Sequence, residues 1–203
     1  MKNYTAKNLD EALESVIKEK DCKKEDIFYE VIEENKHFLG IGNSITISAY
    51  TNQDIKDFIF DYLGNYFINL NQEVAIEIIL ENDLFRVVLD AENNAIIIGK
   101  GGQTLRAISN VLKAATNNTF KKRVNIIVDV NHYKEDRYRK IRSLANRVAK
   151  EVAKTHVDAA LDPMPNDERK VIHEFLAKRN NIKTESEGEG NQRHLVIKYV
   201  EEK

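Results

Sequence analysis

The sequence contains a single cysteine, Cys22, and no tryptophan. One cysteine excludes an intramolecular disulfide bond and any metal site built from several thiolates. No apolar run approaches the roughly 18 residues that a transmembrane helix needs, and the first residues, MKNYTAKNLDEAL, lack the apolar stretch of a signal peptide. We therefore expect a cytoplasmic protein without a transmembrane segment.

Proline and glycine are also scarce, with two and eight among 203 residues, and the net charge at neutral pH is only −2. This small value conceals an uneven distribution. Residues 91–157 carry 14 basic and five acidic side chains, a net charge of +9, whereas residues 51–90 carry two basic and eight acidic ones. A basic segment of this size is typical of a protein that binds a polyanion, although a solvated helical face has the same composition.

The hydrophobic periodicity predicts an α+β fold with three small domains. Residues 1–51 have the pattern of a β-α-β-β unit, in which Asn8 and Glu11 are placed to cap the helix. Residues 52–57 are expected to form a linker to the second domain.

The second domain is predicted over residues 58–130. From residue 54 onward the pattern reads α-β-β-α-α-β, with a tight hairpin at ENDL between the first two strands. The third domain, residues 131–203, reads α-α-β-β. Its long basic helix ends at LDPMPND, where Asn166 or Asp167 is expected to cap the next helix.

Three of the eight glycines stand close together in IIIGKGGQTLRAI, residues 96–108. A Walker phosphate loop needs a glycine and a hydroxyl residue where this sequence has Asn94 and Gly101. A Rossmann loop needs a glycine at Thr104 and a parallel βαβ unit around it. Both patterns fail, and the sequence therefore argues against a nucleotide-dependent enzyme.

The pattern that remains is G-x-x-G, residues 99–102, between two helices. Glycines let a nucleic-acid backbone approach the main chain closely, and the N-terminus of the following helix attracts phosphate. Lys100 and Arg106 add positive charge, while residues 96–98 could line an apolar groove for bases. The tetrapeptide alone leaves an ordinary turn between helices open as the alternative.

Residues 54–130 resemble a bacterial K homology (KH) domain of the second topological type, because IIIGKGGQTLRAI matches the signature I-G-x-x-G-x-x-[IL]-x-x-[IL]. The resemblance implies a loop that clamps single-stranded RNA. The residues assigned to this contact are Ile98, Gly99, Lys100, Gly101, Gly102, Gln103 and Arg106. The basic residues assigned to support it are Lys121, Lys122, Arg123, Arg147 and Lys150, of which those on the long helix could equally serve only to keep it soluble.

A second candidate contact is the pair Arg169 and His173 in NDERKVIHEFL, one helical turn apart and away from the apolar stripe. An arginine offers a fork of donors to phosphate, and a histidine adds a donor and a flat face. With TESEGEGNQRHLVI after it, the pair resembles the R-three-H module of single-stranded nucleic-acid-binding proteins, where Arg193 could supply a second phosphate contact. A solvated helix face is the alternative. No nucleophile or carboxylate pair is spaced to use His173 in catalysis, and we expect no metal and no cofactor.

The segment KHFLGIGN, residues 36–43, resembles the signature of the Jag N-terminal domain. The three motifs in this order are similar to the Jag (KhpB) family of bacterial RNA-binding proteins over nearly the whole chain. The resemblance implies a non-catalytic cytoplasmic regulator of cell elongation and division. The implied partners are a small KH protein, KhpA, and a YidC-type membrane insertase, which would recruit the chain to the inner face of the membrane. Single-stranded DNA in place of RNA, a homodimer, and a protein adaptor that acts through residues 1–50 stay open.

Overall fold

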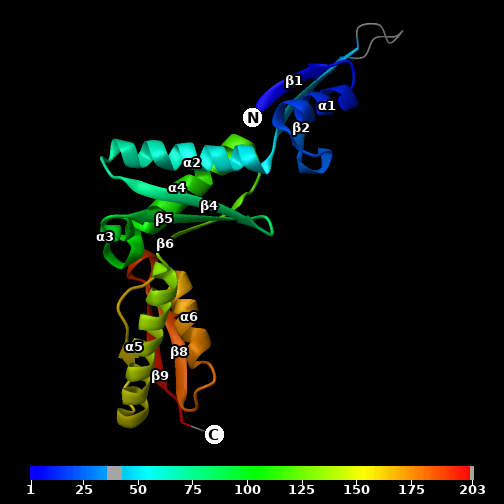
Figure 1. The fold of residues 1–203 in the computed structure, drawn as a ribbon. Helices are drawn as coiled ribbons and strands as arrows, with labels where there is room; N and C mark the ends of the chain where they lie inside the picture. Colours follow the sequence, from blue (N-terminus) through cyan, green and yellow to red (C-terminus); the bar gives the residue numbers. More distant parts are fainter. Residues whose placement is uncertain (36–42, 202–203) are drawn as a thin grey trace. The chain divides into compact units, whose positions relative to one another are not determined.

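Figure 1 shows the computed structural model, in which residues 1–35 and 43–201 are described. The described residues form helices and three three-stranded sheets, which confirms the predicted α+β class. The chain divides into two compact units, Met1–Asn131 and His132–Lys203. None of the described helices is both long enough and apolar enough to cross a membrane.

The first sheet is antiparallel, has the strand order β1-β3-β2 and carries one helix. The elements are β1 (Lys2–Ala6), α1 (Leu9–Lys20), β2 (Phe28–Asn35) and β3 (Ser44–Tyr50), as the predicted β-α-β-β order requires. Asn8 caps α1 as predicted, because its side-chain oxygen accepts a hydrogen bond from the backbone N–H of Glu11 at 2.9 Å. Apart from Asn43, the KHFLGIGN segment lies outside the described residues.

The second sheet has the order β4-β5-β6, with β4 antiparallel and β6 parallel to β5. The elements follow the predicted α-β-β-α-α-β order: α2 (Asn52–Asn69), β4 (Val74–Glu81), β5 (Leu84–Ala91), α3 (Asn94–Ile98), α4 (Gln103–Phe120) and β6 (Asn125–Val130). Residues 52–57, the predicted linker, form the first turns of α2. The domain boundaries on either side of this segment stay predictions.

Local chemistry explains the main features of this sheet. Asn82 and Asp83 have φ values of 47° and 60°, as a two-residue hairpin requires of both central residues, and these residue types tolerate positive φ. Alternate side chains of β5 and β6 are buried, namely Phe85, Val87, Leu89, Ile126, Val128 and Val130. Each such side chain contributes about 1.5–3 kcal/mol on burial. This layer therefore holds α3 and α4, and with them the glycine loop, in place.

The second unit has a sheet of order β7-β9-β8. Its elements are α5 (Tyr133–Thr155), β7 (Ala159–Ala160), α6 (Asn166–Leu176), β8 (Ile182–Glu187) and β9 (His194–Tyr199). The predicted α-α-β-β order is present, with β7 in addition. This strand escaped prediction because two alanines have little β propensity, and they pair with Val196 and Ile197 only through the tertiary fold.

The start of α6 differs from the prediction. Neither Asn166 nor Asp167 caps the helix; the N-cap residue is Pro165, and no side chain supplies the cap hydrogen bond. Both side chains are engaged elsewhere, since Asn166 Oδ1 accepts from the Arg169 guanidinium at 3.2 Å and Asp167 accepts from the Tyr138 hydroxyl at 2.9 Å. Other side-chain hydrogen bonds have thus replaced the local cap.

Candidate nucleic-acid interface

The glycine loop joins α3 to α4 through a backbone conformation that side chains resist. All three glycines have positive φ, with 69° at Gly99, 58° at Gly101 and 77° at Gly102. Residues Lys100–Gly102 form a single 3₁₀ turn, and Gln103 begins α4. The turn itself therefore favours glycine at all three positions.

Gly99 and Gly101 differ in what surrounds them. A Cβ on Gly99 would lie 2.1 Å from Thr104 Oγ1, so this position is closed by the chain itself. A Cβ on Gly101 would meet nothing within 4 Å. The main chain at Gly101 therefore faces open space, which is the condition for close approach of another molecule.

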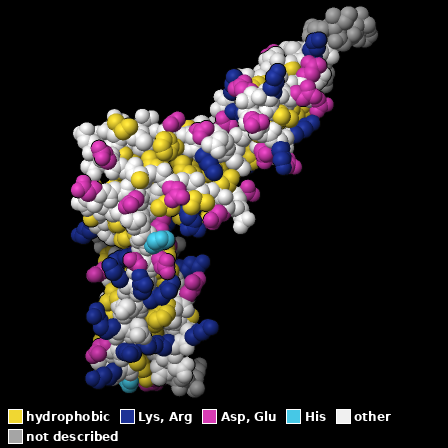
Figure 2. Space-filling model, viewed as in Figure 1, with side chains coloured by type: hydrophobic (Ala, Val, Ile, Leu, Met, Phe, Trp, Pro, Cys, Tyr) yellow, Lys and Arg dark blue, Asp and Glu magenta, His cyan; other side chains and the backbone are white. Residues whose placement is uncertain are grey.

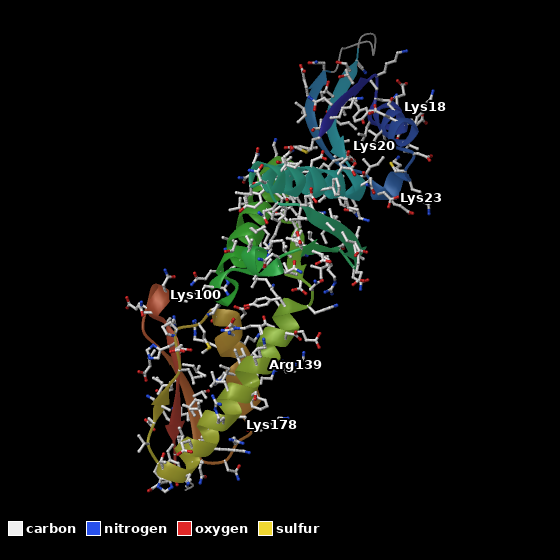
Figure 3. All side chains as sticks on the ribbon, turned by 60° about the vertical axis from the view of Figure 1, so that its left-hand side comes forward. Lys18, Lys20, Lys23, Lys100, Arg139 and Lys178 are labelled. Carbon is white, nitrogen blue, oxygen red and sulfur yellow. The ribbon has the colours of Figure 1, made fainter. Side chains whose placement is uncertain are left out.

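The loop is accessible at the end of a long helix. Lys100, labelled in Figure 3, and Gly101 are exposed, Ile98 and Gly99 are half-buried, and Gly102 is buried. The N-cap residue of α4 has no side chain to accept from the first N–H groups of this 18-residue helix. The exposed side chains of Gln103 and Arg106 lie in its first turns. Positive side chains and the positive end of the α4 helix dipole thus share one exposed point of the surface.

A cavity of about 1020 Å³ lies beside α3. Ile96 lines it and is 53% exposed, whereas Ile97 is 2% exposed and belongs to the core. Ile97 is therefore not available to line a groove for bases, whereas a groove wall made by Ile96 and the half-buried Ile98 stays a prediction. The remaining wall is mixed: it includes the acidic residues Glu73, Asp90 and Glu92 as well as Val74 and two alanines.

The Arg169 and His173 pair is divided by burial. His173 is exposed, and its Nδ1 lies 2.6 Å from Thr184 Oγ1. Arg169 is only 9% exposed, and its guanidinium donates to the Met164 carbonyl at 2.6 Å and to Asn166. The expectation that Arg169 lies on the solvated side of the helix is therefore wrong, because main-chain and side-chain acceptors at the start of α6 and in the loop before it draw the guanidinium inward.

Arg193 is exposed and precedes β9. Its carbonyl accepts a hydrogen bond from the backbone N–H of Met164 at 3.2 Å. Met164 therefore stands between the two arginines, bonded through its carbonyl to the side chain of Arg169 and through its amide to the main chain of Arg193. The structure thus links Arg169 to Arg193, but through a residue that the sequence did not indicate.

The basic residues after α4 lie away from the glycine loop. Helix α4 has 18 residues, and a helix of that length separates its two ends by roughly 27 Å. Lys121 pairs with Glu30 at 3.3 Å, and Lys122 Nζ lies 3.7 Å from the ring centroid of Phe28. Arg123 is exposed. Of the three supporting cations predicted directly after α4, Lys121 and Lys122 therefore contact the first sheet.

The long helix α5 carries eight Lys and Arg residues. In Figure 2, Lys and Arg side chains gather over the unit that contains α5 and α6. Arg147 and Lys150 are both exposed on this helix. Arg137 instead forms two hydrogen bonds of 3.0 and 2.9 Å with the buried carboxylate of Glu168, and these bonds raise the pKa of Arg137. Arg137 therefore joins α5 to α6.

Comparison with known proteins agrees with the order of these parts. The family model of the Jag N-terminus matches residues 4–51, that of the KH domain residues 66–135, and that of the R-three-H domain residues 139–199. A protein of Bacillus subtilis (strain 168) named RNA-binding protein KhpB is 35% identical over 208 residues, which cover 98% of this chain and 99% of the relative. The chain belongs to the KhpB family.

Two other relatives carry the same name. The KhpB protein of Clostridium symbiosum is 28% identical over 201 residues, which cover 97% of this chain and 90% of the relative. The KhpB protein of Streptococcus pneumoniae serotype 2 is 26% identical over 155 residues, 74% of this chain and 47% of that longer protein. Family membership and the three domain types confirm the resemblance that the motifs indicated.

Met164 and Thr184 are the contacts of this KhpB-family chain that the sequence did not reveal. Met164 acts through its main chain, which leaves no trace in residue type. Thr184 on β8 is 9% exposed, and its hydroxyl contacts the imidazole of His173 on α6, 11 positions earlier in the chain. In the sequence Thr184 is only one polar residue of a predicted strand, and nothing there indicates that it contacts the histidine. Among the described residues, no group of three or more His, Cys, Asp or Glu side chains is arranged to hold a metal ion.

Proposed function

We propose that this chain binds single-stranded RNA and catalyses no reaction. The observation that carries the proposal is the exposed Lys100–Gly101 backbone at the uncapped N-terminus of α4. Membership of a family whose relatives are named RNA-binding proteins supports it. Single-stranded DNA would satisfy the same phosphate contacts, and competition between the two nucleic acids decides between them.

The charges around the loop suggest how a strand is oriented. Phosphate is favoured beside Lys100 and the helix N-terminus. The carboxylates of Glu73, Asp90 and Glu92 should repel phosphate from the cavity. The exposed side chain of Ile96 gives the same cavity an apolar wall, which suits a base. We therefore expect the backbone of the strand to lie on the loop, with bases turned toward Ile96.

The second contact is expected in the unit formed by residues 132–201. The groups available there are the exposed Arg193, the imidazole of His173, and the cations of α5 such as Arg147 and Lys150. Each ionic contact to single-stranded RNA makes the slope of log affinity against log salt more negative by about 0.7. Binding by both units should therefore weaken steeply with added salt.

The direct test is the full chain with Lys100→Asp and Gly101→Asp. Gly101 has space for a side chain, and its φ of 58° is tolerated by aspartate, so the fold should persist. We expect most RNA retention in a filter-binding assay to be lost. The matched control is Lys18→Asp with Asn65→Asp, two exposed positions with the same total change of charge. Equal retention by the two variants would remove the glycine loop from the site.

Family membership also supports a cellular role. We place the chain in the cytoplasm as a post-transcriptional regulator of cell elongation and division. The partners to test are a KhpA-like KH protein, a YidC-type membrane insertase that recruits the chain to the membrane, and a second copy of the chain. Co-purification from cells, with and without ribonuclease, separates contacts made through RNA from direct ones.

An adaptor role for the N-terminal domain is the second candidate, and the edge strand β2 favours it. Tyr29, Val31 and Ile32 are 44%, 45% and 50% exposed on this strand. Exposed apolar residues on an edge strand are suited to pairing with another protein. If Val31→Lys abolishes rescue of a deletion strain while RNA affinity is unchanged, the adaptor role is primary. Loss of rescue by the Lys100 and Gly101 variant alone would favour RNA binding.

A further inference from the structure

The chemistry expected of an Arg-x-x-x-His pair is direct contact with nucleic acid by both side chains, and the environment of Arg169 opposes this. Its side chain is buried, with Nη1 bonded to the Met164 carbonyl at 2.6 Å and Nη2 to Asn166 Oδ1 at 3.2 Å. Nε is buried as well and has no partner among the described residues. A phosphate would have to displace the loop before it could reach these donors.

The loop held by Arg169 runs beside the start of β9. The N–H of Leu161 donates to the Leu195 carbonyl at 2.9 Å, and the N–H of Met164 donates to the Arg193 carbonyl at 3.2 Å. These bonds continue the pairing that begins with β7. The Met164 side chain also packs in the core of this unit, and the residue is 9% exposed. Met164 is therefore fixed on three sides, and one of the three is the Arg169 guanidinium.

Arg193 is the exposed residue at the other end of this connection. Its main chain follows the 3₁₀ turn Gly190–Gln192 and is fixed by the bond from Met164. Its side chain reaches solvent. An exposed arginine and a buried one are thus connected through the main chain of Met164.

We propose that Arg169 is a positioning residue, which acts through Met164 to hold Arg193 where it contacts the RNA backbone. The role rests on the proposed RNA-binding function and divides the pair: His173 stays a surface contact, and Arg169 becomes part of its support. The planar guanidinium suits this role because one fork bonds two acceptors in fixed geometry.

The test is a double-mutant cycle on the full chain with Arg169→Lys, Arg193→Ala and both together. Lysine keeps the charge but loses the fork. Affinity for a short labelled single-stranded RNA is measured by fluorescence anisotropy at several salt concentrations. We expect Arg193→Ala to weaken binding and to make the salt slope shallower by about 0.7. Arg169→Lys should weaken binding by no more than Arg193→Ala does, and should have no further effect when Arg193 is already absent.

A second measurement, on the RNA-free chain, follows amide hydrogen exchange at Met164 by NMR. Arg169→Lys should accelerate this exchange, whereas Arg142→Lys, the same change at an exposed position of α5, should not. Unchanged exchange at Met164, or losses of affinity that add in the double variant, would overturn the positioning role while RNA binding stands. A parent chain that retains no RNA would instead overturn the proposed function, and the positioning role with it.

Discussion

Replacing Gly99 and Gly101 separately by alanine tests whether the loop is built as the structure indicates. The two residues lie two positions apart in one loop, and both have positive φ. Gly99 combines φ 69° with ψ 179°, a region that only glycine populates readily, whereas Gly101 has φ 58° and ψ 27°, in the left-handed helical region. The same substitution should therefore have unequal effects.

The structure sets the size of the difference. At Gly101 the added methyl meets nothing within 4 Å, so the cost is the left-handed conformation alone, about 1 kcal/mol. At Gly99 the backbone term is about 1–3 kcal/mol. The methyl would also lie 2.1 Å from Thr104 Oγ1 and 2.8 Å from Thr104 Cβ, which adds an overpacking term of about 1–3 kcal/mol. We expect Gly99→Ala to lower the free energy of unfolding by about 3 kcal/mol or more.

Native-state amide exchange of Val87 and Val128, in the buried β5–β6 pair, reports the stability of this domain without interference from the others. The difference between the variants should be about 2 kcal/mol. Thr104→Ala should not rescue Gly99→Ala fully, because the Thr104 Cβ and main-chain nitrogen lie 2.8 and 3.0 Å from the new methyl. Equal destabilisation by the two alanines would refute the account of the loop.

The second unit offers three more predictions. Thr184→Val removes the hydrogen-bond partner of the histidine on α6 and should weaken RNA binding in the anisotropy assay, whereas Thr184→Ser should preserve it. Equal affinities of the two variants would show that RNA binding does not need this hydrogen bond. Arg137→Ala removes the cation that pairs with the Glu168 carboxylate, which is 4% exposed, and should lower the free energy of unfolding in urea by about 2 kcal/mol. Arg139→Ala, in an exposed pair, should lower it hardly at all. Hydrogen bonds from Lys198 and a neighbouring lysine lower the pKa of Glu185 to about 2. This contribution to stability is present above the ordinary value of 4.5 and is lost as the pH falls toward 2; an NMR titration of Lys198→Met should show the Glu185 midpoint moving back up, and an unmoved midpoint would contradict the assignment.

Elements with a local cause were predictable. Asn8 and Glu11 stand at the spacing of a helix cap, and the structure shows the hydrogen bond between them. Asn82 and Asp83 are residues that adopt positive φ, and they form the predicted hairpin turn. In both cases neighbours along the chain carry all the required chemistry.

Features that depend on the folded arrangement of the chain were not predictable. Arg169 has the spacing of a surface residue, yet the main chain of Met164 and the side chain of Asn166 draw it inward. Lys121 belongs to a basic cluster in the sequence, but it pairs with Glu30, 91 positions away. No local pattern encodes such contacts, since they exist only once the elements pack.

The candidate site shows the same division. The glycines and Lys100 were identified because a loop of this kind is continuous in sequence, and the structure confirms that Lys100 and Gly101 are exposed. The carboxylates that line the adjoining cavity come from three separate places, before β4, near the end of β5 and before α3. Only the folded sheet brings them beside Ile96.

The most direct measurement of the central claim is an NMR titration of the isotopically labelled full chain with single-stranded RNA, followed at the backbone amides. RNA that lies on the loop should shift the amides of Gly101 and Gln103 at the lowest RNA concentrations, in step with binding measured independently. Shifts confined to other parts of the chain, with these two amides unmoved at saturation, would show that RNA binds elsewhere.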